Sequence, residues 1–296
     1  GISIIWPLFN SLIPPMLEDL GLAAFWTGFI LTWDNIINMF LQPVIGSLSD
    51  RTRSRFGRRK PFLILGAPLA ALFFILVPFV RDNFVLIALA ILGTNLAMAV
   101  FRSPTIAFLG DLFQPNERSK ANGVINLMGG LGGAVALFAG GALYKIGVPV
   151  PFIVGAGVMV IAIAIVVAFV RDDPAAAGEA AAAASAPAPG VLANLKQVAT
   201  DADRSGLFLL AAIFSWFVGW NATEAFFTLY ARNILGMEVG TATQMLTVFA
   251  GALIIFSIPS GLIATRIGRK PTILIGLAGM AVGVIAATTL RSPTLL

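Results

Sequence analysis

The 296-residue sequence has no cysteine, no histidine and few charged residues, which make up 11% of the chain. Without cysteine there can be no disulfide, and without cysteine and histidine the usual protein ligands for zinc, copper and iron–sulfur clusters are missing. No histidine is available as a general base, and no nucleophile–base arrangement stands out in the sequence. These absences argue against an enzyme and against a resident metal, and they leave carboxylates as the groups that could bind a proton.

Apolar residues dominate instead, since 58% of the chain is hydrophobic and its mean hydropathy is +0.93. An ordinary soluble domain is nearer half apolar and a quarter charged. The apolar residues come in runs of about 18 or more, the length that crosses roughly 30 Å of hydrocarbon at about 1.5 Å per residue, without the alternation of a barrel strand. The sequence therefore predicts an all-α, multi-pass integral membrane protein.

Nine membrane-spanning helices are expected from the positions of these runs. They cover roughly residues 1–17, 22–48, 62–80, 84–112, 121–144, 149–170, 205–230, 240–264 and 271–290. The basic residues indicate how the chain is oriented. If the turn from Asp50 to Lys60 is cytoplasmic, fourteen of the 19 basic residues lie inside, four lie outside (Arg81, Lys145, Arg232 and Arg291), and Arg102 falls within a span.

This bias follows the positive-inside rule. The net charge of +5 is explained in the same way, because the basic residues flank membrane spans. We therefore expect the lipid bilayer of the plasma (inner) membrane, and no nucleic acid, as the partner of these residues.

The chain contains an internal repeat. Gly46–Arg51 leads through Gly57–Pro61 into an apolar span, and Gly261–Arg266 leads through Gly268–Pro271 into another. The two Lys-Pro pairs lie 210 residues apart (270 minus 60), after the second and the eighth span, so one repeat comprises six spans. Parallel halves of this kind are a transporter arrangement. We therefore expect about nine of twelve helices, the first of them truncated, with about three more following the last residue.

The repeat also predicts domains. A stretch rich in Ala and Pro, residues 172–190, lacks the large apolar side chains that packing requires. We expect a six-helix N-terminal half over 1–171, a flexible cytoplasmic central loop over 172–204, and a partial C-terminal half of three helices over 205–296. Glycine pairs in the fifth span (129–130, 132–133 and 140–141) predict close helix packing rather than a nucleotide-binding loop.

The repeated basic turn has a composition suited to a cytoplasmic gate. Glycine permits a tight turn, proline suits the first turn of a helix, and arginines hold the segment against an anionic membrane face. Asp50, near the end of its span, can pair with these arginines. The residues that we assign to a cytoplasmic gating loop are Gly46, Asp50, Arg51, Arg55, Gly57, Arg58 and Arg59 in the first copy, and Thr265, Arg266, Gly268 and Arg269 in the second.

This turn resembles the signature loop of the major facilitator superfamily, and the longer run 42–62 is similar to the sucrose-transporter branch. Trp33-Asp34 is also similar to the Trp-Asp pair of the glycoside–pentoside–hexuronide cation symporters. The resemblance implies the major facilitator fold, alternating access, and co-transport of a disaccharide or glycoside with a cation. Two departures stand out: Asn38 and Gln42 occupy the positions of the symporters' sodium-site acids, so that site is not reproduced.

Three charged residues lie within spans: Asp34, Arg102 and Glu224. Each needs a partner or a water-filled cavity, because a charge at mid-bilayer costs about 2.5–3.5 kcal/mol even on insertion scales. Polar residues accompany them on the same helix faces. The predicted substrate and cation pathway consists of Asp34, Asn38, Gln42, Asn95, Arg102, Asn221 and Glu224. We also consider a direct pair between Asp34 and Arg102, and stacking of a sugar ring on Trp6, Trp33, Trp216 or Trp220.

Other interpretations stay open for these residues. The polar stripe could be an interhelical hydrogen-bond network, and Glu224 could be a carboxylate solvated in an outer vestibule. We expect a secondary active transporter that couples a proton, or else sodium, to a small-molecule substrate. We expect that substrate to be a sugar, and the protein to work as a monomer without a cofactor. The alternatives are an exporter or facilitator of another small molecule, and a membrane receptor or scaffold that does not transport.

Overall fold

The computed structural model describes residues 2–112, 118–170 and 204–289. In these residues the chain forms nine α-helices, one short 3-10 helix and no strand. The helices are α1 (Ile2–Asp19), α2 (Ala24–Arg51), α3 (Lys60–Leu76) followed by η1 (Val77–Phe79), α4 (Phe84–Leu112), α5 (Arg118–Ile146), α6 (Val150–Phe169), α9 (Ser205–Asn233), α10 (Val239–Ile267) and α11 (Arg269–Thr289). Each coincides with one of the nine expected spans, which confirms the all-α fold. The expected central loop, 172–204, lies outside the described residues except for Arg204.

Six of these helices are long and apolar enough to cross a membrane by length and composition: α3 with η1, α4, α5, α6, α9 and α10. The apolar part of α11 is shorter and runs from Lys270 to Ala286. α1 ends in Glu18 and Asp19, and α2 carries the polar stripe that starts at Asp34, so both are less apolar than their neighbours.

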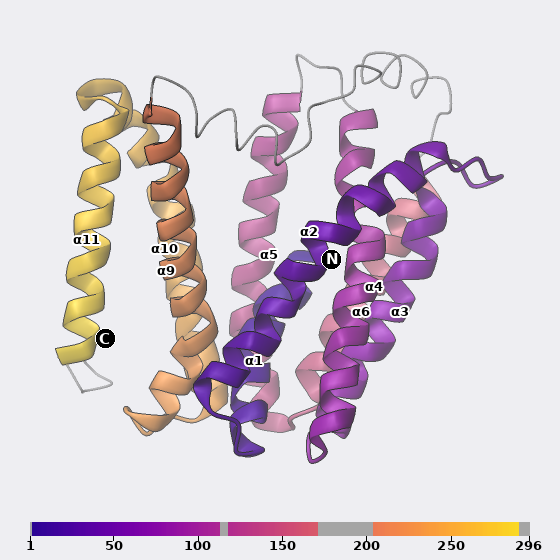
Figure 1. The fold of residues 1–296 in the computed structure, drawn as a ribbon, viewed down its shortest axis with the longest axis horizontal. Coiled ribbons are helices and arrows are strands. Elements are labelled where there is room, and N and C mark those ends of the chain that lie inside the picture. Colours follow the sequence, from indigo (N-terminus) through magenta and orange to yellow (C-terminus); the bar gives the residue numbers. More distant parts are fainter. Residues whose placement is uncertain (1, 113–117, 171–203, 290–296) are drawn as a thin grey trace.

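Successive helices run in opposite directions between two ends of the molecule (Figure 1). One end carries the basic turn between α2 and α3 and the turn between α10 and α11; we call it the inner end, because the positive-inside rule predicts it to be cytoplasmic. The outer end carries the connections 20–23, 80–83, 147–149 and 234–238. Arg81, Lys145 and Arg232 therefore lie at the opposite end from the basic turn, as the distribution of charges predicted.

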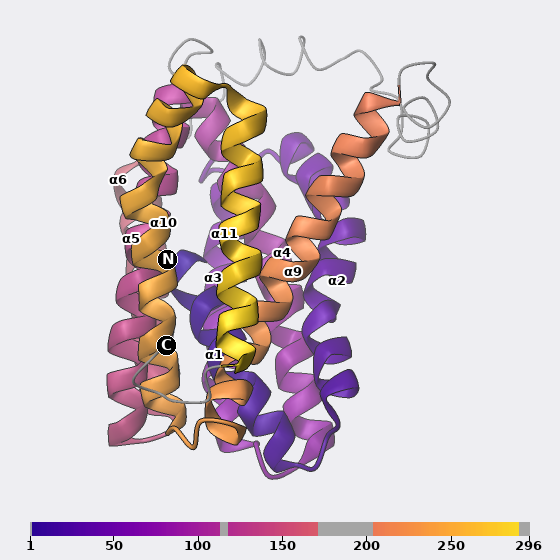
Figure 2. The same cartoon turned by 90° about the vertical axis from the view of Figure 1, so that its left-hand side faces the viewer.

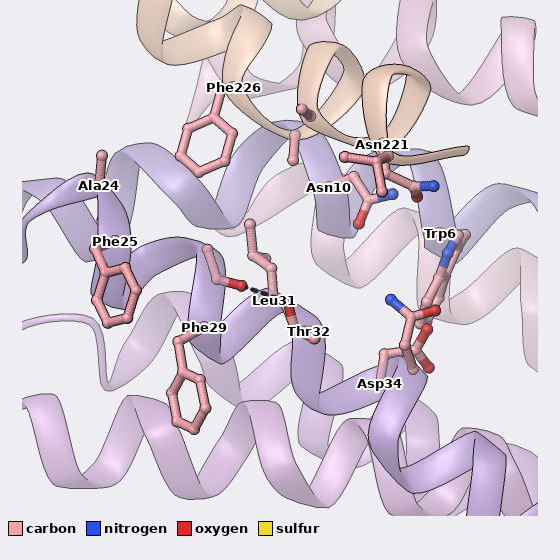
Figure 3. Close-up of a pocket in the computed structure, with 15 residues that line it drawn as sticks. Trp6, Asn10, Ala24, Phe25, Phe29, Leu31, Thr32, Asp34, Asn221 and Phe226 are labelled. Carbon is pink, nitrogen blue, oxygen red and sulfur yellow. Dashed lines mark hydrogen bonds between the residues drawn. The ribbon is translucent and has the colours of Figure 1, made fainter. Parts of the chain in front are cut away.

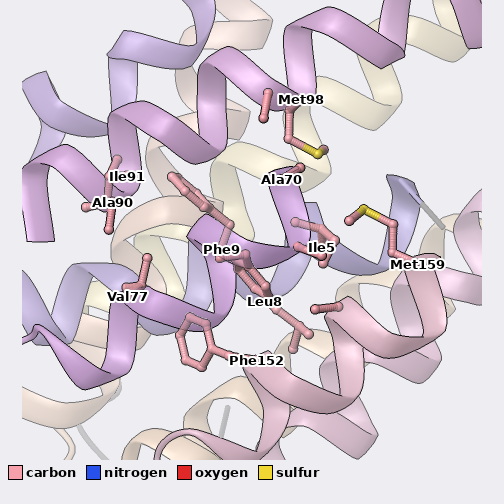
Figure 4. Packing of buried hydrophobic residues seen from close by; sticks show 14 of the residues in the cluster. Ile5, Leu8, Phe9, Ala70, Val77, Ala90, Ile91, Met98, Phe152 and Met159 are labelled. Atoms are coloured by element: carbon pink, nitrogen blue, oxygen red, sulfur yellow. The ribbon is translucent and has the colours of Figure 1, made fainter. Parts of the chain in front are cut away.

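The N-terminal helix set, α1 to α6, has a continuous apolar core built around α1 (Figure 4). Ile5, Leu8 and Phe9 of α1 are almost fully buried. The ring centroids of Phe152 on α6 and Phe74 on α3 lie 4.8 Å apart. Lipid tails are as apolar as the side chains, so the hydrophobic effect does not drive helices together within a membrane. Helices associate there chiefly through close packing at small residues. A Cβ atom at Gly66 of α3 would lie 2.8 Å from Cβ of Phe101 on α4, so only glycine allows this contact.

The C-terminal helix set, α9 to α11, meets the N-terminal set mainly where α10 packs on α5 and α9 packs on α1 (Figure 2). The tightest point joins Gly141 of α5 and Gly240 of α10. A Cβ atom on Gly141 would lie 2.3 Å from the carbonyl oxygen of Gly240, and a Cβ atom on Gly240 would lie 2.6 Å from the carbonyl oxygen of Gly141. The prediction that glycines of the fifth span serve close packing is therefore confirmed at this position.

Candidate functional site

A cavity of about 540 Å³ lies between α1, α2 and α9, so both helix sets contribute to its wall. Its polar lining residues are Trp6, Asn10, Thr32, Asp34, Asn35 and Asn221. Figure 3 shows Trp6, Asn10, Asn221 and Asp34 gathered at one end, and Phe25, Phe29 and Phe226 toward the other. Ligand cavities in proteins commonly have about 300–1,000 Å³ and a few convergent polar groups, and this one has both features.

Asp34 is buried, with 5% of its surface exposed, although it lies in the middle of a membrane-length helix. Asn38, one turn further along α2, donates a hydrogen bond from Nδ2 to Oδ1 of Asp34. Part of the predicted polar stripe is therefore an internal hydrogen bond of α2. Gln42, the next member, is half-buried and does not line the cavity; its backbone carbonyl accepts a hydrogen bond from Oγ of Ser103 on α4 at 3.2 Å.

Among the described residues, Arg102 and Asp34 do not form an ion pair. The direct pair that we considered from the sequence is therefore not seen in this conformation. The two groups interact electrostatically at longer range. The guanidinium of Arg102 lies over the ring of Trp6 instead, 5.6 Å from the ring centroid. Cation–π contacts contribute about 0.5–2 kcal/mol, more when they are shielded from water. Trp6 also stacks on Phe9 at 5.5 Å, so its ring is held in place at the cavity wall.

Glu224 of α9 is half-buried and accepts a hydrogen bond from the side chain of Asn10 on α1, which ties it to the N-terminal set. Trp220, on its own helix, also donates to it. Of the seven predicted pathway residues, Asp34 and Asn221 line the cavity and Glu224 lies beside it through Asn10. Asn10 was missed in the sequence. The signal was there, since Asn10 is an amide in the middle of an apolar span.

Asn95 of α4 lies away from the cavity lining and is fully buried. Neither polar atom of its side chain has a hydrogen-bond partner among the described residues. A buried polar group without a partner costs about 1–3 kcal/mol. Asn95 therefore carries an unmet hydrogen-bonding capacity inside the N-terminal set.

The basic turn forms an ion-pair cluster at the inner end. Nη2 of Arg59 lies 2.5 Å from Oδ1 of Asp50, and Arg59 also donates to Oγ of Ser49. Oδ2 of Asp111, near the end of α4, lies 2.8 Å from Nη2 of Arg58 and 3.1 Å from Nε of Arg59. The predicted pairing of Asp50 with the arginines is confirmed. Asp111 was not among the predicted gating residues, although an acid at the inner end of a neighbouring span was visible in the sequence.

The two copies of the turn share one backbone feature and differ in their ion pairs. Gly57 has φ 99° and Gly268 has φ 94°, the left-handed region that favours glycine. Thr265 stands where the first copy has Asp50, and its Oγ1 donates to the backbone carbonyl of Leu262 at 2.7 Å. Arg266 is exposed, and the side chain of Arg269 lies outside the described residues.

The other members of the gating loop lie on the surface or at a helix contact. Arg51 and Arg55 are exposed, and the guanidinium of Arg55 lies 4.9 Å from the ring centroid of Phe56. A Cβ atom at Gly46 would lie 3.2 Å from Oγ of Ser103, so this glycine lets α2 approach α4 closely. The cluster therefore braces α2, the turn and α4 against one another, while its exposed arginines face outward at the inner end.

The fold consists of two sets of antiparallel helices with a cavity between them and an ion-pair cluster at one end. This arrangement is typical of multi-pass membrane transporters. The model of the Major Facilitator Superfamily matches residues 2–296, and the chain belongs to this superfamily. This membership indicates a transporter rather than an enzyme and confirms the family to which the basic turn pointed.

Several characterised relatives are similar to parts of the chain. The sucrose transport protein SUC3 of Arabidopsis thaliana is 28% identical over 161 residues, which cover 47% of this chain and 27% of that protein. The sucrose transport protein SUT1 of Oryza sativa subsp. japonica is 35% identical over 82 residues, covering 28% of this chain and 15% of that protein. The general alpha-glucoside permease of Schizosaccharomyces pombe is 26% identical over 155 residues, which cover 47% of this chain and 28% of that protein. The matched regions thus span less than a third of each relative.

Proposed function

We propose that the protein is a secondary active transporter that carries a disaccharide or glycoside together with a proton, by alternating access, across the plasma membrane. The observation that carries this proposal is the cavity between the two helix sets, in which a buried carboxylate, Asp34, faces an aromatic ring and several amide side chains. The names of the relatives, sucrose transport proteins and an alpha-glucoside permease, supply the substrate class.

The polar end of the cavity suits a sugar. Asn10, Asn35 and Asn221 each present both a donor and an acceptor, as a hydroxyl group requires, and Thr32 adds a hydroxyl of its own. Trp6 also lines this end of the cavity. Its contacts with Phe9 and Arg102 fix the orientation of its ring before substrate binds, so a bound sugar would lose less free energy in ordering it.

Asp34 is the proposed proton carrier. A buried carboxylate is far less costly when it is protonated, so substrate and proton can enter such a site together as a neutral unit. Asn38 donates a hydrogen bond to the carboxylate directly. Glu224 would couple protonation of Asp34 to movement of the C-terminal set, since Asn10, a residue of the cavity wall, hydrogen-bonds to it. We propose that one chain acts alone, as a monomer.

Uptake by the complete protein in proteoliposomes tests the proposal, with a panel of disaccharides and glycosides and with or without a pH gradient. We expect gradient-driven accumulation of at least one sugar. Asp34→Asn, which imitates the protonated side chain, should abolish accumulation but keep exchange of labelled for unlabelled sugar. Asp82→Asn, which removes a carboxylate on an exposed outer loop, is the matched control and should behave as the unaltered protein.

Three results would count against the proposal. Uptake that ignores the pH gradient would indicate a facilitator or exporter. Binding of sugar without any exchange would indicate a receptor. Accumulation that survives Asp34→Asn at its full level would move the proton to another group, of which Glu224 is the first to test.

A further inference from the structure

Four polar side chains meet at the outer end, where α1 and α9 finish. Glu18 and Asp19 are the last residues of α1, and Arg232 and Asn233 are the last residues of α9. Nη2 of Arg232 lies 2.6 Å from Oδ1 of Asp19, and its Nη1 lies 3.8 Å from Oε2 of Glu18. Nδ2 of Asn233 donates to Oε1 of Glu18 at 2.6 Å. Each of these contacts joins the N-terminal set to the C-terminal set.

The two acids are poorly placed for α1 itself. The C-terminal end of a helix carries a partial negative charge, so a carboxylate there destabilises the helix by about 0.3–1 kcal/mol. Arg232, at the C-terminal end of α9, is placed favourably for its own helix and offsets this repulsion across the gap. The pairing of Glu18 and Asp19 with α9 therefore accounts for acids that helix formation alone would disfavour.

A second contact between the sets lies close to the first. Nζ of Lys145 on α5 donates to Oε1 of Gln244 on α10 at 3.0 Å, beside the tight crossing of Gly141 and Gly240. The outer ends of α1, α5, α9 and α10 are thus drawn together.

The inner end is arranged differently. The ion pairs of the basic turn join α2, the turn and α4, which all belong to the N-terminal set. Phe208 and Phe214, in the inner half of α9, are 69% and 71% exposed, and Figure 2 shows α9 leaning away from α10 toward that end. The ion pairs that join the two sets therefore lie at the outer end, whereas those at the inner end lie within the N-terminal set.

We propose that Glu18, Asp19, Arg232 and Asn233 form an outer latch that holds the cavity shut toward the outside and separates when the protein opens outward. This inference rests on the proposed alternating-access function. The latch is only partly buried, the exposed fractions of the Arg232 and Asp19 side chains being 35% and 58%, so water can replace its contacts at small cost when it opens.

Accessibility of the cavity from outside tests the latch. The 296 residues contain no cysteine, so Ala222→Cys places a single thiol on the cavity wall. Its reaction with a membrane-impermeant maleimide, added outside intact cells, reports opening. We expect Arg232→Gln and Asp19→Asn each to raise the labelling rate about 1.5- to fivefold, as the loss of weak, partly exposed pairs allows. The charge-swapped Asp19→Arg/Arg232→Asp variant should return the rate toward its original value.

Arg81→Gln is the matched control. Arg81 also lies at the outer end, but its ion pair is with its neighbour Asp82 at 3.8 Å, within the N-terminal set. This variant should leave labelling unchanged. The latch is refuted if neither Arg232→Gln nor Asp19→Asn raises the rate, or if Arg81→Gln raises it equally. Should Arg232→Gln fail to reach the membrane, Asn233→Ala, which removes only the hydrogen bond to Glu18, supplies the same test.

The readout separates this inference from the proposed function, because labelling does not require transport of any sugar. Increased labelling together with no uptake of any sugar supports the latch and refutes the proposed substrate. Normal gradient-driven uptake with unchanged labelling in the latch variants supports the proposed function and refutes the latch.

Discussion

Replacing Gly141 by alanine should force the two helix sets apart at their tightest crossing. The added carbon would lie 2.3 Å from the carbonyl oxygen of Gly240 and 2.6 Å from Cγ of Gln244. A carbon and an oxygen that are not bonded approach to about 3.3 Å, so α5 and α10 must separate locally by about 1 Å. The carbonyl oxygen belongs to the backbone of a helix and cannot rotate away as a side chain would.

The free energy follows from two opposing effects. Overpacking of a close contact costs about 1–3 kcal/mol. Alanine is a better helix former than glycine by about 0.8–1.0 kcal/mol, which offsets part of that cost. The net effect of Gly141→Ala on the free energy of unfolding is a destabilisation of up to about 2 kcal/mol, which changes the equilibrium constant for unfolding by up to about thirtyfold.

Gly123 on the same helix offers the matched control, because a Cβ atom there would meet nothing within 4 Å. Gly123→Ala should keep only the gain in helix propensity and raise the thermal unfolding midpoint of the purified protein slightly, whereas Gly141→Ala should lower it. In cells, Gly141→Ala should also raise external labelling of a thiol at Ala222. If both alanine variants shift the unfolding midpoint in the same direction, the close contact between α5 and α10 does not limit stability.

Three further substitutions test the buried Asn95, the ion pairs of Asp111 and the aromatic ring of Trp6 at the cavity. Asn95→Leu removes two unpartnered polar atoms, so the free energy of unfolding should rise by about 1–3 kcal/mol; a lower unfolding midpoint would show that this amide has a partner. Asp111→Asn weakens two charge-assisted contacts to the arginines of the basic turn and should cost about 1–3 kcal/mol, whereas the exposed Asp82→Asn should cost nothing measurable. Trp6→Leu removes the ring at the cavity and its cation–π contact, so KM for sugar uptake should rise; Trp216→Leu, outside the cavity lining, should leave KM unchanged.

Most of the helices could be predicted because the membrane imposes a simple requirement. In hydrocarbon each backbone polar group must be bonded within its own helix, so apolar runs of sufficient length become helices whatever their neighbours are. The turns could also be predicted, because they depend on the residues within them. Gly57 and Gly268 both take positive φ because a sharp change of direction is needed there, and the repeat of this turn revealed the six-helix period.

The candidate site was harder to predict because it depends on how helices are rotated and paired. Asp34 and Asn221 line the cavity, since charged and amide side chains in apolar spans must face something polar. Asn38 was expected to face the pathway with Asp34 but bonds to it along the same helix. Arg102 was expected near Asp34, yet its closest described partner is the ring of Trp6.

The amino-acid sequence by itself determined the membrane helices, their orientation and the basic turns, because these follow from hydropathy, charge and backbone preferences acting within a few residues. Tertiary structure alone decided which distant residues meet. Asn10 reaches Glu224, Arg232 reaches Asp19, and Gly141 touches Gly240 across separations of about a hundred residues or more. Such contacts depend on the rotation of one helix against another, and small residues and van der Waals packing set that rotation through many partners at once.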